Sequence, residues 1–259
     1  SILDQHADSY RKIRNTFRFL LGNINDKSQK INLEEINLES LPELEQFMLH
    51  KIYLIDQKFK NYFKVYDFHN LYKDLLNFCT VDLSAFYFDI RKDCLYCESK
   101  DSNKRISCIL VLNILLESLL KWFAPILSFT TEEIYRLIKN DKSIHLETFT
   151  EYPLKFLNEN LYLKWQDLIK LRDQVNLSIE EKRASKIIGS SLEASLLLKI
   201  NQKKIDILKN EDLAEIFITS EVILEPTEID KIIIETKKAK GDKCPVCWKI
   251  SLLPCKRHK

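Results

Sequence analysis

Apolar residues recur at helical spacing over most of the chain. They stand three or four positions apart, as on a helix with one buried face. The pattern predicts helices over residues 8–22, 43–65, 67–95, 102–123, 130–138 and 158–182. The stretch 102–123 is apolar on nearly every side, so we expect a central buried helix that Pro125 ends. The predicted fold is mainly α, an antiparallel bundle of about five helices.

Two local patterns refine this prediction. Thr130 and Glu133 have the spacing of a capping box, which would begin the helix 130–138. From residue 191 to 200, alternate residues are apolar, as in a strand with one buried face. Further strands are expected over 216–224 and 229–234, with a short helix near 205–215. A small α+β unit therefore follows the bundle.

These patterns divide the chain into three expected domains. The helical domain covers residues 1–183, the α+β domain covers 184–235, and a basic tail with a zinc knuckle covers 236–259.

The composition narrows the class of protein. Hydrophobic residues make up 45% and charged residues 30%, which is typical of a folded chain. The 3 glycines cannot spell either glycine-rich phosphate-binding motif, so a nucleotide-binding domain of those kinds is excluded. The longest charge-free apolar stretch, residues 106–116, is too short to cross a bilayer. With no secretion signal and an odd count of 7 cysteines, we expect a cytoplasmic protein without a membrane partner.

Charge is balanced overall but uneven along the chain. Residues 236–259 carry a net charge of +7, whereas the rest carries −5. A basic tail indicates an anionic partner such as RNA, although a solvated tail explains the charge equally well. A second basic group, Arg11, Arg14 and Arg18, falls on one helical face.

The tail also contains the spacing of a metal site. Cys244 and Cys247 form one pair, and Cys255 and His258 form a second pair after seven residues. Two such pairs can complete a tetrahedron around zinc, and four protein ligands leave no open position, so the site would be structural. The alternative is free thiols in a frayed tail. Cys94-Leu-Tyr-Cys97 has the same spacing without a second pair nearby, and we interpret it as packing at a helix end.

No pattern typical of a catalytic site is found. The 5 histidines lie in different predicted elements, and no nucleophile elbow, zinc-protease motif or carboxylate pair occurs.

Six strings, in order along the chain, carry a resemblance to a known family. They are YRKIRNTFRFLLGN (10–23), FCTVDLSAFYFDIRKD (78–93), APILSFTTEEI (124–134), SIHL (143–146), IGSSLEA (188–194) and KCPVCW (243–248). In these strings the chain resembles the anticodon-binding and C-terminal parts of bacterial isoleucyl-tRNA synthetases. In bacterial members of the family, the last two zinc ligands are usually cysteines after a longer spacer, whereas here they are Cys255 and His258.

The resemblance implies a class I ligase that activates isoleucine with ATP and joins it to its tRNA. Its implied cofactors are a structural zinc in this chain and ATP in a catalytic domain that would lie upstream, together with an editing domain. The implied partners are the isoleucine tRNA and those upstream domains, and the enzyme is expected to be a monomer. This chain alone would be non-catalytic.

The implied role makes six residues candidates for RNA contact. Single-stranded bases are read by stacking and edge hydrogen bonds, while basic groups hold phosphates. The candidates are Arg11, Arg14, Arg18, Trp248, Lys256 and Arg257. For Trp248, packing inside the knuckle is an equal alternative to stacking on a base. Two other functions remain open: a free-standing zinc-dependent RNA-binding module, and the matching region of another class I synthetase such as a valyl enzyme.

Overall fold

The computed structural model describes residues 1–24, 31–140, 142–229 and 231–258. The chain forms two compact units. The first, which we call the bundle, contains residues 1–95 and 99–162, and the second contains residues 96–98 and 163–259. The three expected domains, with boundaries near 184 and 236, stay a prediction.

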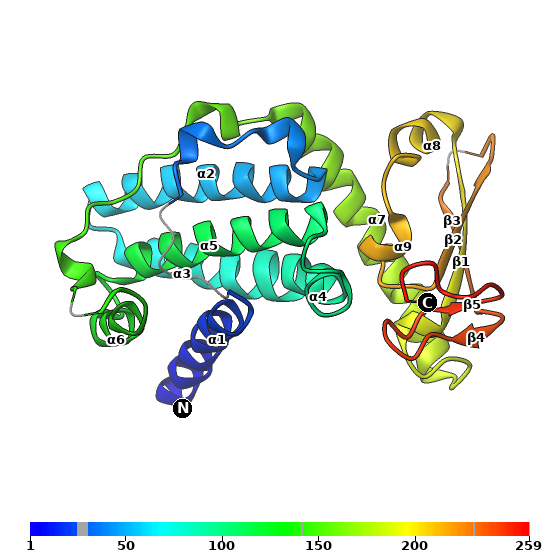
Figure 1. The fold of residues 1–259 in the computed structure, drawn as a ribbon, viewed down its shortest axis with the longest axis horizontal. Helices are drawn as coiled ribbons and strands as arrows, with labels where there is room; N and C mark the ends of the chain where they lie inside the picture. The colour runs from blue at the N-terminus through cyan, green and yellow to red at the C-terminus, as the bar shows by residue number, and fades with distance from the viewer. Residues whose placement is uncertain (25–30, 141, 230, 259) are drawn as a thin grey trace. The chain divides into compact units, whose positions relative to one another are not determined.

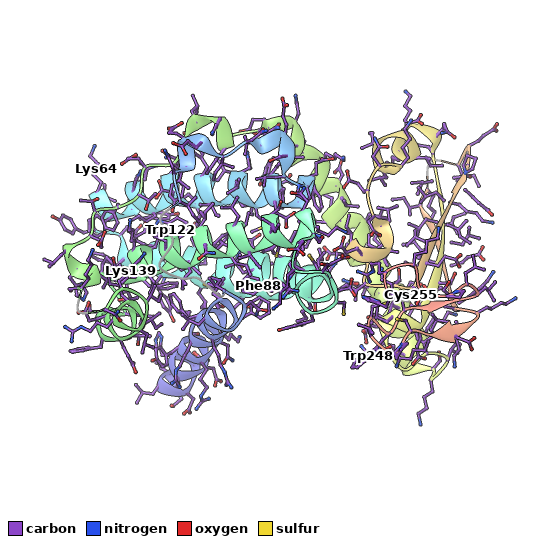
Figure 2. All side chains as sticks on the ribbon, in the orientation of Figure 1. Lys64, Phe88, Trp122, Lys139, Trp248 and Cys255 are labelled. Carbon is purple, nitrogen blue, oxygen red and sulfur yellow. The ribbon has the colours of Figure 1, made fainter. Side chains whose placement is uncertain are left out.

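The bundle is helical, and its helices follow the predicted apolar stripes. Helix α5 packs against α1, α2 and α6, and runs beside α2 (Figure 1). Its Trp122 and Phe123 are at most 1% exposed, which confirms the prediction of a central buried helix. Figure 2 shows Trp122 among the side chains of the bundle. The helices are α1 (Ile2–Asn23), α2 (Glu43–Lys64), α3 (Phe68–Asn77), α4 (Phe88–Cys97), α5 (Asn103–Phe123), α6 (Ser128–Lys139) and α7 (Glu159–Ala184), which continues into the second unit.

Helix α5 is also the one helix of the described residues that is long and apolar enough to cross a membrane, judged by length and composition alone. In its most apolar window, 67% of the residues are buried within the protein. Such burial is typical of a core helix, whose apolar sides face other side chains.

The predicted helix 67–95 contains a π-helical stretch, η3 (Phe78–Tyr87), between α3 and α4. Within it, the Ser84 hydroxyl donates to the carbonyl of Cys79, five residues back, at 2.8 Å. Just beyond this stretch, Arg91 Nε and Nη2 donate to the two carboxylate oxygens of Glu45 at 2.7 and 2.5 Å. Glu45 and Arg91 are 0% and 3% exposed, so this is a buried ion pair.

The predicted capping box at Thr130 is wrong. Helix α6 begins at Ser128, its N-cap position is Leu127, and no side chain caps it. Thr130 therefore lies inside the helix, where its hydroxyl hydrogen-bonds the Tyr10 hydroxyl at 3.0 Å. The helix begins two residues before the predicted start at 130. Pro125 ends α5, and the short turn that follows leads directly into α6.

The second unit is built on a three-stranded sheet in the order β2-β1-β3. Strand β1 (Ala194–Ile200) pairs parallel with β2 (Glu221–Pro226) and antiparallel with β3 (Ile233–Lys238). Alternate residues of β1 are buried, as predicted. The Ser178 hydroxyl of α7 bonds the Thr236 hydroxyl of β3 at 2.7 Å, so α7 lies against the sheet.

Two predicted strands are shifted along the sequence. Residues 213–216 form the short helix α9 (Leu213–Ile216), capped by the Asp212 carboxylate, so β2 begins only at Glu221. Strand β3 runs on to Lys238 because it pairs with β1 at an edge, where outward lysines remain in solvent. The single helix predicted near 205–215 is thus two short helices, α8 (Gln202–Leu208) and α9. The predicted fold class, a helical bundle followed by a small α+β unit and a Cys/His knuckle, is confirmed.

Candidate metal centre and nucleic-acid interface

The candidate metal centre lies on a small hairpin, which with the loop after it (residues 241–258) we call the knuckle. Strand β4 (Asp242–Lys243) pairs with β5 (Ile250–Ser251). Gly241 enters the hairpin at φ +116°, and a Cβ there would collide with the Ser251 carbonyl. Only glycine avoids both the strain and the collision, so Gly241 fixes the start of the hairpin.

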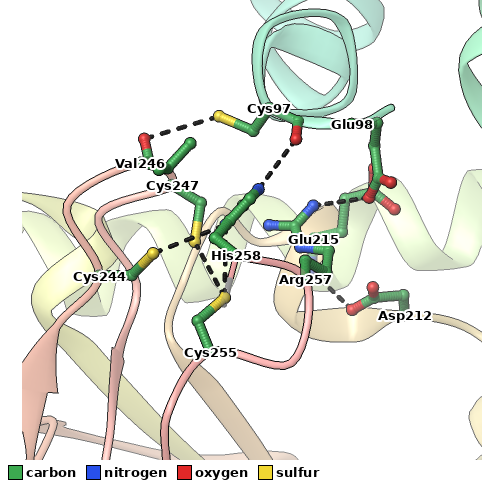
Figure 3. A network of polar contacts seen from close by, with 10 residues as sticks. All are labelled: Cys97, Glu98, Asp212, Glu215, Cys244, Val246, Cys247, Cys255, Arg257 and His258. Carbon is green, nitrogen blue, oxygen red and sulfur yellow. Dashed lines mark hydrogen bonds and ion pairs between the residues drawn. The ribbon is translucent and has the colours of Figure 1, made fainter. Parts of the chain in front are cut away.

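The knuckle brings all four predicted ligands together. The ligand atoms of Cys244, Cys247, Cys255 and His258 lie within 4.8 Å of one another. Figure 3 shows their side chains converging. The Cys247 and Cys255 sulfurs are 3.9 Å apart, and His258 Nδ1 lies 3.5 Å from Cys244 Sγ and 3.4 Å from Cys255 Sγ. Ligand atoms of four-coordinate zinc are separated by about 3.5–3.8 Å, so the cluster is compatible with a zinc site.

Backbone hydrogen bonds in the knuckle favour the thiolate form of two candidate ligands, Cys244 and Cys255. Backbone hydrogen bonds, chiefly from Cys247 and also from Val246, lower the pKa of Cys244 to about 6. Burial raises the pKa of the neighbouring Cys247 thiol. Burial also acts to raise the pKa of Cys255, but backbone hydrogen bonds from Arg257 and His258 outweigh it and lower that pKa. Since metals bind thiolates, these hydrogen bonds prepare two of the sulfurs for a cation.

Two residues that the sequence analysis did not connect with the site lie beside it. The Cys97 carbonyl lies 2.9 Å from His258 Nε2, and the Glu98 carboxylate accepts from Arg257 Nη1 at 2.7 Å (Figure 3). The Cys97 sulfur is not in the cluster; it donates weakly to the Val246 carbonyl at 3.7 Å. We interpreted the Cys94-x-x-Cys97 spacing as packing at a helix end, and no local pattern indicated that the backbone of this segment lies beside the site.

The predicted RNA-contact residues of the bundle lie on one exposed face. Arg11, Arg14 and Arg18 are all exposed on α1, while Ile13 and Phe17 of the same helix are buried. Arg11 Nη1 pairs with Asp8 Oδ1 at 2.5 Å, but both side chains are more than half exposed. An ion pair in solvent is worth little and can be exchanged for a phosphate, so the three guanidinium groups can meet a ligand.

The other three candidates lie on the knuckle, and they differ in accessibility. Trp248 is 58% exposed at φ +62°, and Lys243 Nζ lies over one face of its ring, 5.1 Å from the ring centre, so the opposite face is the one available for stacking. Lys256 is exposed. Arg257 is 31% exposed and held by Glu98, so it must break that ion pair before it can bind a phosphate.

Comparison with known proteins places the chain in a family. Residues 45–198 match the family described as "Anticodon-binding domain of tRNA ligase". The protein named isoleucine–tRNA ligase in Pelagibacter ubique (strain HTCC1062) is 65% identical over 100% of this chain and 29% of its own length. Proteins of the same name in Kosmotoga olearia and Agrobacterium fabrum are 37% and 38% identical over 97% of the chain, and 28% and 27% of their own lengths.

The chain thus spans less than a third of the length of these relatives. The family match covers more than half of the chain and includes most of the bundle together with helix α7. On this basis, the chain belongs to the family of anticodon-binding domains of tRNA ligases.

Proposed function

We propose that this chain is the tRNA-reading region of an isoleucine–tRNA ligase, and that a structural zinc ion holds its knuckle. The observation that carries the proposal is the match of the whole chain to a protein named isoleucine–tRNA ligase at 65% identity. Activation of isoleucine with ATP, its transfer to tRNA, and editing then belong to the parts of the ligase that this chain does not span. The ligase is expected to act as a monomer in the cytoplasm.

The exposed basic residues supply the chemistry of RNA recognition. Arg14 and Arg18 present planar guanidinium forks from a rigid helix, which suits a base edge or a pair of phosphate oxygens. Trp248 offers an open aromatic face of the kind on which unpaired bases stack. Lys256, a mobile point charge, suits contact with phosphates without regard to sequence.

The donors of the knuckle support zinc as the ion. Three sulfurs and one imidazole nitrogen are the donor set of many structural zinc sites. Zinc bound by four protein ligands supplies a cross-link between the two halves of the knuckle, without an open position for a substrate. Cys244 and Cys247 would hold it from the hairpin, and Cys255 and His258 from the loop that follows.

Binding of the purified chain to individual tRNAs tests the function. We expect the chain to prefer an isoleucine tRNA over the same tRNA with an exchanged anticodon. Arg14→Ala or Arg18→Ala should weaken that binding by about 1–3 kcal/mol and reduce the preference. Lys256→Ala should weaken binding to every tRNA alike and flatten its salt dependence.

Lys12→Ala is the matched control for the arginine variants. It removes the same charge from the same exposed helix, but off the face that Arg14 and Arg18 share. It should leave the anticodon preference unchanged. Equal binding of all tRNAs by the unchanged chain would refute the isoleucine assignment. Unchanged affinity and salt slope in every variant would place the RNA surface elsewhere.

A further inference from the structure

We propose that the segment Tyr96–Glu98 is a working part of the metal centre, because its Cys97 carbonyl determines which nitrogen of His258 binds the metal. The inference rests on the zinc site proposed above and deepens it. The segment comprises the last two residues of α4 and the residue after it. It belongs to the same unit as the knuckle, although 161 residues separate Cys97 from His258.

The hydrogen bond between His258 and the Cys97 carbonyl can run in one direction only. A carbonyl oxygen only accepts, so at 2.9 Å from the Cys97 carbonyl, Nε2 must carry the hydrogen. In a neutral imidazole the other nitrogen, Nδ1, then has a free lone pair. That nitrogen is the one facing the sulfurs of Cys244 and Cys255 (Figure 3). The carbonyl thus selects the tautomer and the ring orientation that a zinc ion at the cluster needs.

The segment also binds Arg257, the residue before His258. Arg257 Nη1 donates to Glu98 Oε1 at 2.7 Å, one position along from the Cys97–His258 contact on both segments. The side chains of Arg257 and Glu98 are only 31% and 19% exposed, so solvent screens this pair less than an open surface pair. Two adjacent contacts hold the loop by both its position and its orientation.

The segment also contacts the hairpin that carries Cys244 and Cys247. The Cys97 sulfur donates weakly to the Val246 carbonyl, between Cys244 and Cys247. The segment therefore contacts the loops that carry both ligand pairs. Loss of a hydrogen-bond partner of a metal-binding histidine typically weakens metal affinity by about 10–100-fold. We expect zinc affinity to fall by about this factor when the contacts of Tyr96–Glu98 with His258 and Arg257 are weakened.

Nitrogen-15 NMR of the zinc-loaded chain tests the tautomer directly. We expect His258 to show a metal-bound Nδ1 and a protonated Nε2, since only this state satisfies both the cluster and the Cys97 carbonyl. Coordination through Nε2 would overturn the inference, because Nε2 could not then donate to the carbonyl.

Zinc affinity, measured by competition with a chelator, tests the contacts of Tyr96–Glu98. Glu98→Gln keeps the shape of the side chain but removes the charge that pairs with Arg257 Nη1, and it should weaken zinc binding by about 10-fold. Asp101→Asn is the matched control, since Asp101 is an exposed acid three residues further on, and it should leave the affinity unchanged. Equal affinity in Glu98→Gln and the unchanged chain would overturn the inference.

Cys97→Ala separates the carbonyl from the thiol. The substitution keeps the backbone carbonyl and should retain zinc, whereas a large loss of zinc would make the Cys97 sulfur a ligand and overturn the inference. The zinc site itself can fail independently: a chain that binds no zinc refutes the metal centre. Zinc bound through Nε2 with normal affinity refutes only the role of Tyr96–Glu98.

Discussion

The bundle and the knuckle bury different kinds of side chain. In the bundle, large apolar side chains such as Trp122 and Phe123 are at most 1% exposed. In the knuckle, the buried side chains are Cys244 and Cys247, both candidate ligands, while Leu252 is 79% exposed. The bundle is thus held by an apolar core, and the knuckle has sulfur where a core would be.

The difference shows that two regions of one chain can depend on different sources of folding free energy. Ordering a residue costs about 1–2 kcal/mol of backbone entropy, which apolar burial must offset. A segment as short and as polar as the knuckle has too little apolar surface for this, and in the proposed zinc site a metal cross-link would take the place of the core. The two regions should therefore respond to different perturbations.

Removal of metal should produce the largest effect, and it should be confined to the knuckle. Structural zinc in comparable finger peptides contributes about 10–16 kcal/mol of apparent binding free energy. A chelator should therefore abolish amide-exchange protection in residues 241–258, while helices α2 and α5 keep theirs. Hydrogen exchange followed by mass spectrometry measures both regions in one experiment.

Variants identify the ligands behind this effect. The double variant Cys244→Ser, Cys247→Ser should lose the one equivalent of zinc that a four-ligand site binds. Cys94→Ala should keep it, since the Cys94 thiol is buried outside the cluster. Full zinc content in the double variant, by elemental analysis, would show that the ligands lie elsewhere.

Breaking the buried ion pair should destabilise the bundle by about 3–5 kcal/mol and leave the knuckle intact. Arg91→Met leaves the Glu45 carboxylate buried without its bidentate partner. Urea unfolding measures the loss. Lys92→Ala, which removes a neighbouring exposed charge paired with Asp89, should cost less than about 1 kcal/mol.

A second substitution sharpens this test. Adding Glu45→Leu to Arg91→Met removes the stranded charge, so the double variant should be more stable than Arg91→Met alone. A single variant as stable as the unchanged chain would mean that the pair contributes nothing to the bundle.

The smallest expected effect comes from a matched pair of glycines. Gly241→Ala should destabilise the knuckle by about 1–3 kcal/mol, because of the strain at φ +116° and the collision with Ser251. Gly22→Ala, at the end of α1 where nothing lies within 4 Å of the added carbon, should instead stabilise the bundle by about 0.5–1 kcal/mol. Thermal unfolding and zinc retention are measured for both variants. A change in stability of the same sign in both would contradict the special role given to Gly241.

Most of the helices could be predicted from the sequence because the buried face of a helix requires apolar residues three or four positions apart. The stripes over 43–65 and 102–123 correspond to α2 and α5 within a residue. The convergence of the four candidate ligands was likewise predicted from local spacing, since Cys244 and Cys247, like Cys255 and His258, are close in sequence.

Features that depend on distant partners were missed. Thr130 matched a capping box locally, but the turn after Pro125 starts α6 earlier. Strand β3 extends into lysines because β1 lies beside it, which no local pattern records. The contact between His258 and the Cys97 carbonyl likewise joins segments far apart in the chain.

The contact between Cys97 and His258 also orders events during synthesis of the chain. The two residues are 161 positions apart, and ribosomes add roughly 5–20 residues per second, so about 8–32 s separate their appearance. The carbonyl at the end of α4 is made long before the imidazole it orients. Because distant contacts form only after the intervening chain has been brought together, the four candidate ligands of the knuckle, which are close in sequence, would meet one another before His258 meets the Cys97 carbonyl.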